Sequence, residues 1–102
     1  MLARNNTGVT APPLTETEIC RWVSDGVKFL IGFTATGTCS AEFRLYVGDD
    51  SDPWYVMQTS PAVRTAYLVD RGTRLPPSTV VSLRVIHESP GEQSFKGTIL
   101  GG

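Results

Sequence analysis

The sequence predicts an all-β fold: one β-sandwich of about seven strands, preceded by an extended N-terminal arm. Three observations predict it. From Glu18 onward, short segments rich in β-branched and aromatic residues recur about every 8 to 15 residues, with turn-forming residues between them. Several of these segments alternate apolar and polar residues, which is the period of a half-buried strand. A chain of 102 residues, 40% of them hydrophobic, is also long enough for one domain with its own core.

The arm is predicted from residues 1–13. They contain Asn-Asn, Thr-Gly and Pro-Pro pairs and show no apolar period, so we do not expect a helix there. The expected organisation is therefore an extended arm over 1–13 and a β-sandwich domain over 14–102. The arm also has no basic stretch followed by an apolar run, and no segment approaches the roughly 20 apolar residues of a membrane-spanning helix. Neither a secretion signal nor a membrane partner is expected.

The expected strands are most clearly marked where the alternation is regular. In 39–47, five apolar residues alternate with polar ones and with Tyr46, and 79–87 repeats the pattern. The seven expected strands are 18–24, 27–35, 39–47, 53–59, 64–70, 79–87 and 93–99. The side chains expected to point into the core are Val27, Phe29, Ile31, Phe33, Cys39, Ala41, Phe43, Leu45, Val47, Val81, Leu83, Val85, Phe95 and Ile99.

The first expected strand, 18–24, also fits a short helix. Asp25-Gly26 between two apolar runs is typical of a two-residue hairpin turn, which would pair 18–24 with 27–35. Thr15 and Glu18, however, have the spacing of a helix capping box. The hairpin is favoured because the helix would be barely two turns long.

The charge balance and the rare reactive residues predict no catalytic chemistry. A net charge of -1 gives no reason to expect a nucleic-acid partner. His87-Glu88 begins like a zinc-protease motif, but the chain has a single His. The acidic stretch 48–53 could offer oxygen ligands to calcium, although a turn between strands is the simpler interpretation. We therefore expect no enzyme activity, no metal and no cofactor.

The two cysteines leave one alternative open. Cys20 and Cys39 could form a disulfide, which would stabilise the domain by about 3 kcal/mol. In the absence of a secretion signal, two reduced and buried thiols are preferred.

Segments 53–59 and 64–70, with the loop that follows, carry the residues that we expect to bind a partner. Both segments have apolar or aromatic side chains on both faces, whereas a half-exposed strand alternates with polar residues. The outer face should then be covered by the arm, a second copy or another partner; a tilted barrel or shifted strand limits would explain the pattern without one. Aromatic and Arg side chains also dominate interface energetics. The expected partner-binding residues are Trp54, Tyr55, Met57, Arg64, Tyr67, Arg71 and Arg74.

The run from Leu75 to Val85, LPPSTVVSLRV, resembles a turn and strand of fibronectin type III and related immunoglobulin-like domains. Their pattern is Leu-x-Pro-x-Thr-x-Tyr-x-Val-x-Val. Leu75, Pro77, Thr79, Leu83 and Val85 fit it, and a valine stands in the place of the tyrosine. The resemblance implies an immunoglobulin-like sandwich.

Four short blocks resemble small β-sandwich proteins of tailed bacteriophage particles, which decorate capsids, cap or adapt tails, or form modules of fibres. The blocks are Phe43–Val47, Pro53–Val56, Arg64–Tyr67 and Phe95–Leu100. The resemblance implies a non-enzymatic structural protein of the virion, made in the host cytoplasm and present in many copies. We expect it to assemble through the arm, residues 1–13, and through the aromatic and Arg side chains of 53–59 and 64–70. Its partners would be other capsid or tail proteins and copies of itself, in a homo-oligomer.

Two other functions stay open. In a carbohydrate-binding sandwich, Trp54, Tyr55 and Tyr46 would stack on the faces of sugars. The Gly101-Gly102 pair resembles the tail of ubiquitin-like modifiers, but the β-grasp fold of those proteins needs a helix for which 36–38 leaves no room.

Overall fold

The computed structural model describes residues 2–5, 9–24, 26, 28–48, 53, 55–59, 64–67 and 73–101. Within these residues the chain forms ten strands and no helix, and hence no helix that could cross a membrane. The strands are β1 (Leu2–Asn5), β2 (Val9–Ala11), β3 (Thr17–Val23), β4 (Lys28–Gly37), β5 (Ala41–Val47), β6 (Tyr55–Thr59), β7 (Arg64–Tyr67), β8 (Thr73–Leu75), β9 (Val80–Ile86) and β10 (Gln93–Gly101).

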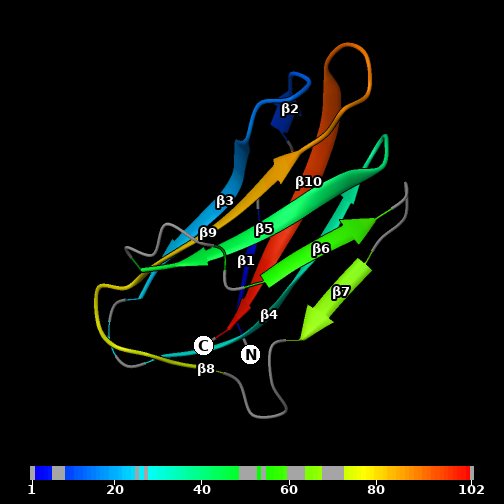
Figure 1. Ribbon diagram of the computed structural model, residues 1–102. Coiled ribbons are helices and arrows are strands. Elements are labelled where there is room, and N and C mark those ends of the chain that lie inside the picture. The colour runs from blue at the N-terminus through cyan, green and yellow to red at the C-terminus, as the bar shows by residue number, and fades with distance from the viewer. Residues whose placement is uncertain are drawn as a thin grey trace.

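The strands form two antiparallel sheets that pack face to face (Figure 1). One sheet has the order β1-β10-β4-β7, with β2 also paired to β10 and β8 also paired to β4. The other sheet has the order β3-β9-β5-β6. The predicted all-β sandwich is therefore confirmed, and residues on both sides of the expected arm boundary belong to it.

Two pairs of short strands each occupy a single position in the first sheet. β1 pairs with residues 98–101 of β10, and β2 pairs with residues 93–95 of the same strand. β7 and β8 likewise lie one after the other along β4. Each sheet thus has four strand positions.

The order of these positions is that of a jelly roll. With β1 and β2 counted together, and β7 with β8, every connection passes from one sheet to the other except the one between β5 and β6. An immunoglobulin-like sandwich shares the two-layer architecture, but it pairs more strands that are consecutive in sequence. The immunoglobulin-like part of the prediction thus holds for the layers, while the connections follow the jelly-roll order.

The seven expected strands all overlap observed ones, but the expected hairpin at Asp25-Gly26 is wrong. The segment 18–24 is strand β3, as favoured over a helix. However, β3 pairs with β9, whereas β4 pairs with β10, β7 and β8. The connection between β3 and β4 crosses from one sheet to the other, because the two strands pair with neighbours in different sheets.

A bulge in β4 explains a second error. Leu100 of β10 pairs with Gly32, but the next residue, Gly101, pairs with Leu30, so β4 holds one extra residue at Ile31. The alternation of faces changes phase at this point. Leu30 is consequently fully buried, whereas Phe29, expected in the core, is 45% exposed. The side chains of Val27 and Ile31, also expected inside, lie outside the described part.

The core between the sheets otherwise follows the alternation. The large residues that are buried include Phe33, Phe43, Leu45, Leu83, Phe95 and Ile99. Phe43 and Phe95 meet edge to face at 5.9 Å, a favourable geometry for aromatic rings. Cys39, also expected inside, is only partly buried and packs against this core.

The LPPST turn that precedes β9 is held by one buried serine. The Ser24 Oγ donates to the carbonyl of Pro76 at 2.7 Å and accepts from the backbone N–H of Thr79 at 2.9 Å. The backbone of Ser24 also pairs with Ser78 and Thr79. These residues of the sequence therefore serve the fold, as a turn leading into a strand.

Gly101 is a strand residue in the sandwich. It pairs with Leu2 on one side and with Leu30 on the other, and it is buried beside Trp22. A ubiquitin-like tail has to be free and extended, so this position argues against the modifier interpretation.

Candidate functional site

The expected partner-binding residues map to the edges of the two sheets. Tyr55 and Met57 lie in β6, the last strand of its sheet, and Arg64 and Tyr67 are the first and last residues of β7, the last strand of the other. Figure 1 shows β6 and β7 on the same side of the sandwich. The side chains of Arg64 and Tyr67, and all of Trp54 and Arg71, lie outside the described residues. Arg74 lies in β8 and is exposed.

Only part of β6 faces outward. Tyr55 and Met57 pair with Leu45 and Phe43, whose side chains are buried. The Tyr55 ring meets the Phe33 ring edge to face at 5.9 Å, and Met57 packs against the core. The apolar character of this face of β6 is therefore explained by the interior of the sandwich.

The outward face of β6 carries a residue that sequence reasoning missed. Val56 is 46% exposed and lies opposite Arg44. Phe29, also missed as a surface residue, lies opposite exposed Arg74 in the pairing of β4 with β8. The alternation in 53–59 places Val56 on the opposite face from Tyr55 and Met57. Which of the two faces points to the core depends on the pairing with β5, and the sequence does not give that pairing.

An ion-pair network covers the outer face of the β3-β9-β5-β6 sheet. Arg44 and Arg84 lie directly opposite each other on β5 and β9. Their positive charges therefore repel each other. The carboxylate of Glu16 bridges them, accepting from Arg44 at 2.8 Å and from Arg84 at 3.0 Å. Tyr46 donates its hydroxyl hydrogen to the same carboxylate at 2.8 Å, and its ring lies under the Arg84 guanidinium at 4.3 Å.

The network continues on both sides of Glu16. Arg44 also donates to Glu42 at 2.6 Å. Arg21 pairs with Glu18 at 3.0 Å, and Ser82 donates to Glu18 at 2.6 Å. Three carboxylates and three guanidiniums thus pair among themselves, so the charges described on this face are balanced internally.

The pKa of Glu16 reflects these contacts. Partial burial raises the pKa, but hydrogen bonds from Arg84, Arg44 and Tyr46 outweigh it, and the pKa is lowered from its ordinary value of 4.5. The pKa of Glu18 is also lowered: burial raises it, and the hydrogen bonds from Ser82 and Arg21 overcome that effect. Both carboxylates are therefore charged at neutral pH.

We expect Glu16→Gln to lower the free energy of unfolding by about 1–2 kcal/mol at pH 7. Because the folded pKa lies below the unfolded one, the contribution is complete above about pH 4.5 and is lost as the pH falls through the lowered pKa. When urea unfolding is measured from pH 7 to pH 3, the free energies of unfolding of the unmodified chain and of Glu16→Gln should become equal at low pH. Glu92→Gln, at an exposed position, is the control and should change the free energy of unfolding little. If the difference in stability between the unmodified chain and Glu16→Gln does not depend on pH, the bridging role of Glu16 is contradicted.

His87, the single histidine, has a structural place. The backbone N–H of Ser89 donates to its Nδ1 at 3.2 Å, so Nε2 carries the hydrogen and donates to the carbonyl of Ala11 at 2.7 Å. The ring is 2% exposed. Since both ring nitrogens are used, His87 fastens β2 to the end of β9 and is poorly placed to bind a metal or transfer a proton.

The two cysteines are free thiols, as preferred from the sequence. Burial raises the pKa of Cys20 to about 11, whereas Cys39 is partly exposed. With a thiol-specific chromogenic reagent at pH 8, we expect Cys39 to react and Cys20 to react on the order of a hundredfold more slowly. In denaturant both should react at similar rates, and Cys39→Ser should leave a single slow thiol. A rapid reaction of Cys20 in the folded chain would contradict this placement.

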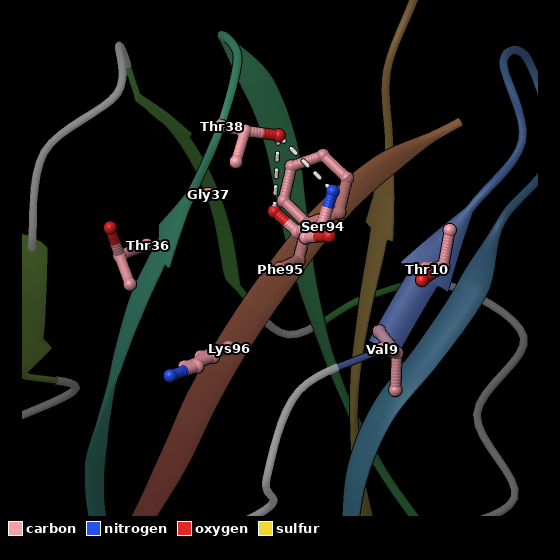
Figure 2. A pocket seen from close by; sticks show the side chains of 8 residues that line it. All are labelled: Val9, Thr10, Thr36, Gly37, Thr38, Ser94, Phe95 and Lys96. Carbon is pink, nitrogen blue, oxygen red and sulfur yellow. Dashed lines mark hydrogen bonds between the residues drawn. The ribbon is translucent and has the colours of Figure 1, made fainter. Parts of the chain in front are cut away.

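A shallow hollow of about 490 Å³ lies where β2, β10 and β4 adjoin (Figure 2). Ser94 lies opposite Thr10, and Lys96 lies opposite Thr36, so these side chains line it from three strands. The Thr38 Oγ1 accepts from the backbone N–H of Ser94 at 3.1 Å and donates to Gln93 at 2.8 Å. Hydroxyl groups and one ammonium group could hydrogen-bond a polar molecule here. Sequence reasoning missed the site because its lining residues come from three strands that are distant in the sequence.

Among the described residues, no group of three or more His, Cys, Asp or Glu side chains could hold a metal ion. Residues 49–52 of the acidic stretch 48–53, which was considered for calcium, lie outside them. Comparison of the chain with protein-family models, with curated proteins and with solved structures finds no match.

Proposed function

We propose that this chain is a non-enzymatic structural protein of a bacteriophage virion, a capsid decoration protein or a component associated with the tail or its fibres. The observation that carries the proposal is the jelly-roll order of its two sheets, because this architecture recurs in viral capsid and lectin domains. The four sequence blocks that resemble tailed-phage proteins support the same class.

The structure suggests which surfaces would make the contacts. β1 and β2 pair with β10 of their own sheet, so an assembly role for residues 1–13 would require exchange of these strands. The outer face of the β3-β9-β5-β6 sheet pairs its charges internally. The proposal therefore assigns the contacts to the edges and apolar positions around β6, supplemented by exposed Arg74.

Proteomics of purified particles tests the proposal. The chain should be found by quantitative mass spectrometry in virions of the phage that encodes it, in many copies per particle. It should remain after the particles are separated from free protein on a density gradient. Absence from virions that contain the known capsid and tail proteins would overturn the proposal.

A carbohydrate-binding role is the second candidate, favoured by the hydroxyl-lined hollow beside Lys96. Its basis differs from the sequence prediction, because Tyr46 is only 9% exposed and is covered by Arg84. A screen of glycans by ligand-observed NMR, with Lys96→Ala as the matched variant, would test it. Binding that is lost in the variant supports this role, and no binding by the intact chain excludes it for the glycans tested.

A further inference from the structure

The two outer strands of the β3-β9-β5-β6 sheet differ in the features that prevent pairing with a further strand. β3 carries a bulge between Glu18 and Cys20 and an ion pair between Glu18 and Arg21. Bulges and charged side chains are the usual means of preventing a further strand from pairing. β3 is therefore a protected edge.

β6 has none of these protections. Its sequence, YVMQT, has no charged residue and no proline. Its register with β5 runs without a shift from Leu45 opposite Tyr55 to Ala41 opposite Thr59. In the part of the chain that the structure describes, β5 is its one hydrogen-bonded neighbour. β6 is thus a regular, neutral edge.

The exposure of β6 indicates where a partner would lie. Tyr55 and Val56 point to opposite faces of the sheet, yet they are 37% and 46% exposed. Surface that is open on both faces at once belongs to the edge of the strand. Alternate backbone N–H and C=O groups of β6 also point away from β5. The chemistry that satisfies such an edge is another β-strand.

We propose that β6 pairs with β6 of a second copy of this chain, antiparallel and about a two-fold axis. With Met57 opposite its own counterpart, Val56 lies opposite Gln58 and Tyr55 lies opposite Thr59. No charged residue enters the pairing, so like charges do not oppose each other. The two sheets become one continuous sheet. This inference rests on the proposed function, for which it names the self-association surface.

The expected dimer is weak in dilute solution. Five residues on each side are far fewer than the roughly 20–30 per side of a standard interface. The dimer fraction should therefore rise with concentration, and attachment of many copies to one particle would strengthen the pairing.

Sedimentation equilibrium of the full chain over a wide concentration range tests this pairing, with two matched variants. In Val56→Glu the new carboxylate lies opposite Arg44, which is already paired with Glu16 and Glu42, and close to its own counterpart in the dimer. The two carboxylates repel each other across the two-fold axis, so this variant should remain monomeric. Val23→Glu is the control. Val23 is 50% exposed, and it lies on the protected edge of the same sheet. This control should associate like the unmodified chain.

Hydrogen exchange of the unmodified chain gives a second readout that needs no variant. Amides of β6 should exchange more slowly at high concentration, whereas those of β3 should not change. A chain that stays monomeric throughout overturns the β6 pairing, as does Val56→Glu associating normally or Val23→Glu failing to associate. Self-association that persists in Val56→Glu overturns this surface alone, and the proposed function is decided separately by the particle composition.

Discussion

Gly101→Ala is expected to destabilise the protein by about 2–3 kcal/mol. A Cβ atom at this position would lie 2.5 Å from the Trp22 ring and 2.6 Å from the backbone carbonyl oxygen of Phe29. A flexible side chain could turn aside, but a carbonyl oxygen in the middle of a sheet cannot. The added methyl group would therefore separate β10 from β4 or displace the indole of Trp22, which is 4% exposed.

Gly26→Ala is the matched control for this substitution. No atom lies within 4 Å of a Cβ built on Gly26, and restriction of the unfolded chain should leave stability unchanged or slightly higher. Urea unfolding followed by tryptophan fluorescence measures both variants. Equal stabilities for the two variants would show that β10 and Trp22 do not pack as described.

Phe95→Ala should have the largest effect of all, about 3–5 kcal/mol. Phe95 is 1% exposed. Its ring meets Phe43 at 5.9 Å and His87 at 5.4 Å, and it lies against the face of Gly37, where a Cβ would be only 2.2 Å away. Removal of the ring therefore leaves a cavity beside Phe43 and His87 and uncovers the backbone of β4 at Gly37.

The loss should be visible as a fall in melting temperature. Each kcal/mol corresponds to about 4–8 °C in a domain of this size, and the loss is a large share of a total stability of about 5–15 kcal/mol. Phe95→Leu keeps most of the volume and should cost less than about half as much. If the alanine and leucine variants melt at the same temperature, the ring does not fill the space described.

Local pattern predicted where the strands lie but not how they pair. Segments such as 39–47 and 79–87 alternate because one face is buried, and that period is written in the sequence. Pairing depends on contacts between distant segments: β9 pairs with β3 and β5, neither of which is adjacent to it in sequence. The Asp25-Gly26 signal was misleading for this reason, because turn residues fit a crossing between sheets as well as a hairpin.

The candidate site shows the same limit at the level of single residues. Tyr55 and Met57 belong to a segment that is apolar on both faces, and the structure divides this segment into a face against the core and the outward Val56. Glu16 lies outside any periodic segment, and its partners Arg44 and Arg84 are 28 and 68 residues away. A residue whose role depends on three strands meeting cannot be recognised from its neighbours in the chain.

The position of β9 and β10 bears on how the protein is made. Each is an inner strand of its sheet, with neighbours on both sides. Among the strands that the structure describes, those that can pair before residues 80–101 have been synthesised are β5 with β6, and β4 with β7 and β8. β1, β2 and β3 have no pairing strand among those described until β9 and β10 are made, so their apolar faces stay exposed until then. We therefore expect folding to follow synthesis of this region, at the slow rate typical of chains dominated by long-range contacts.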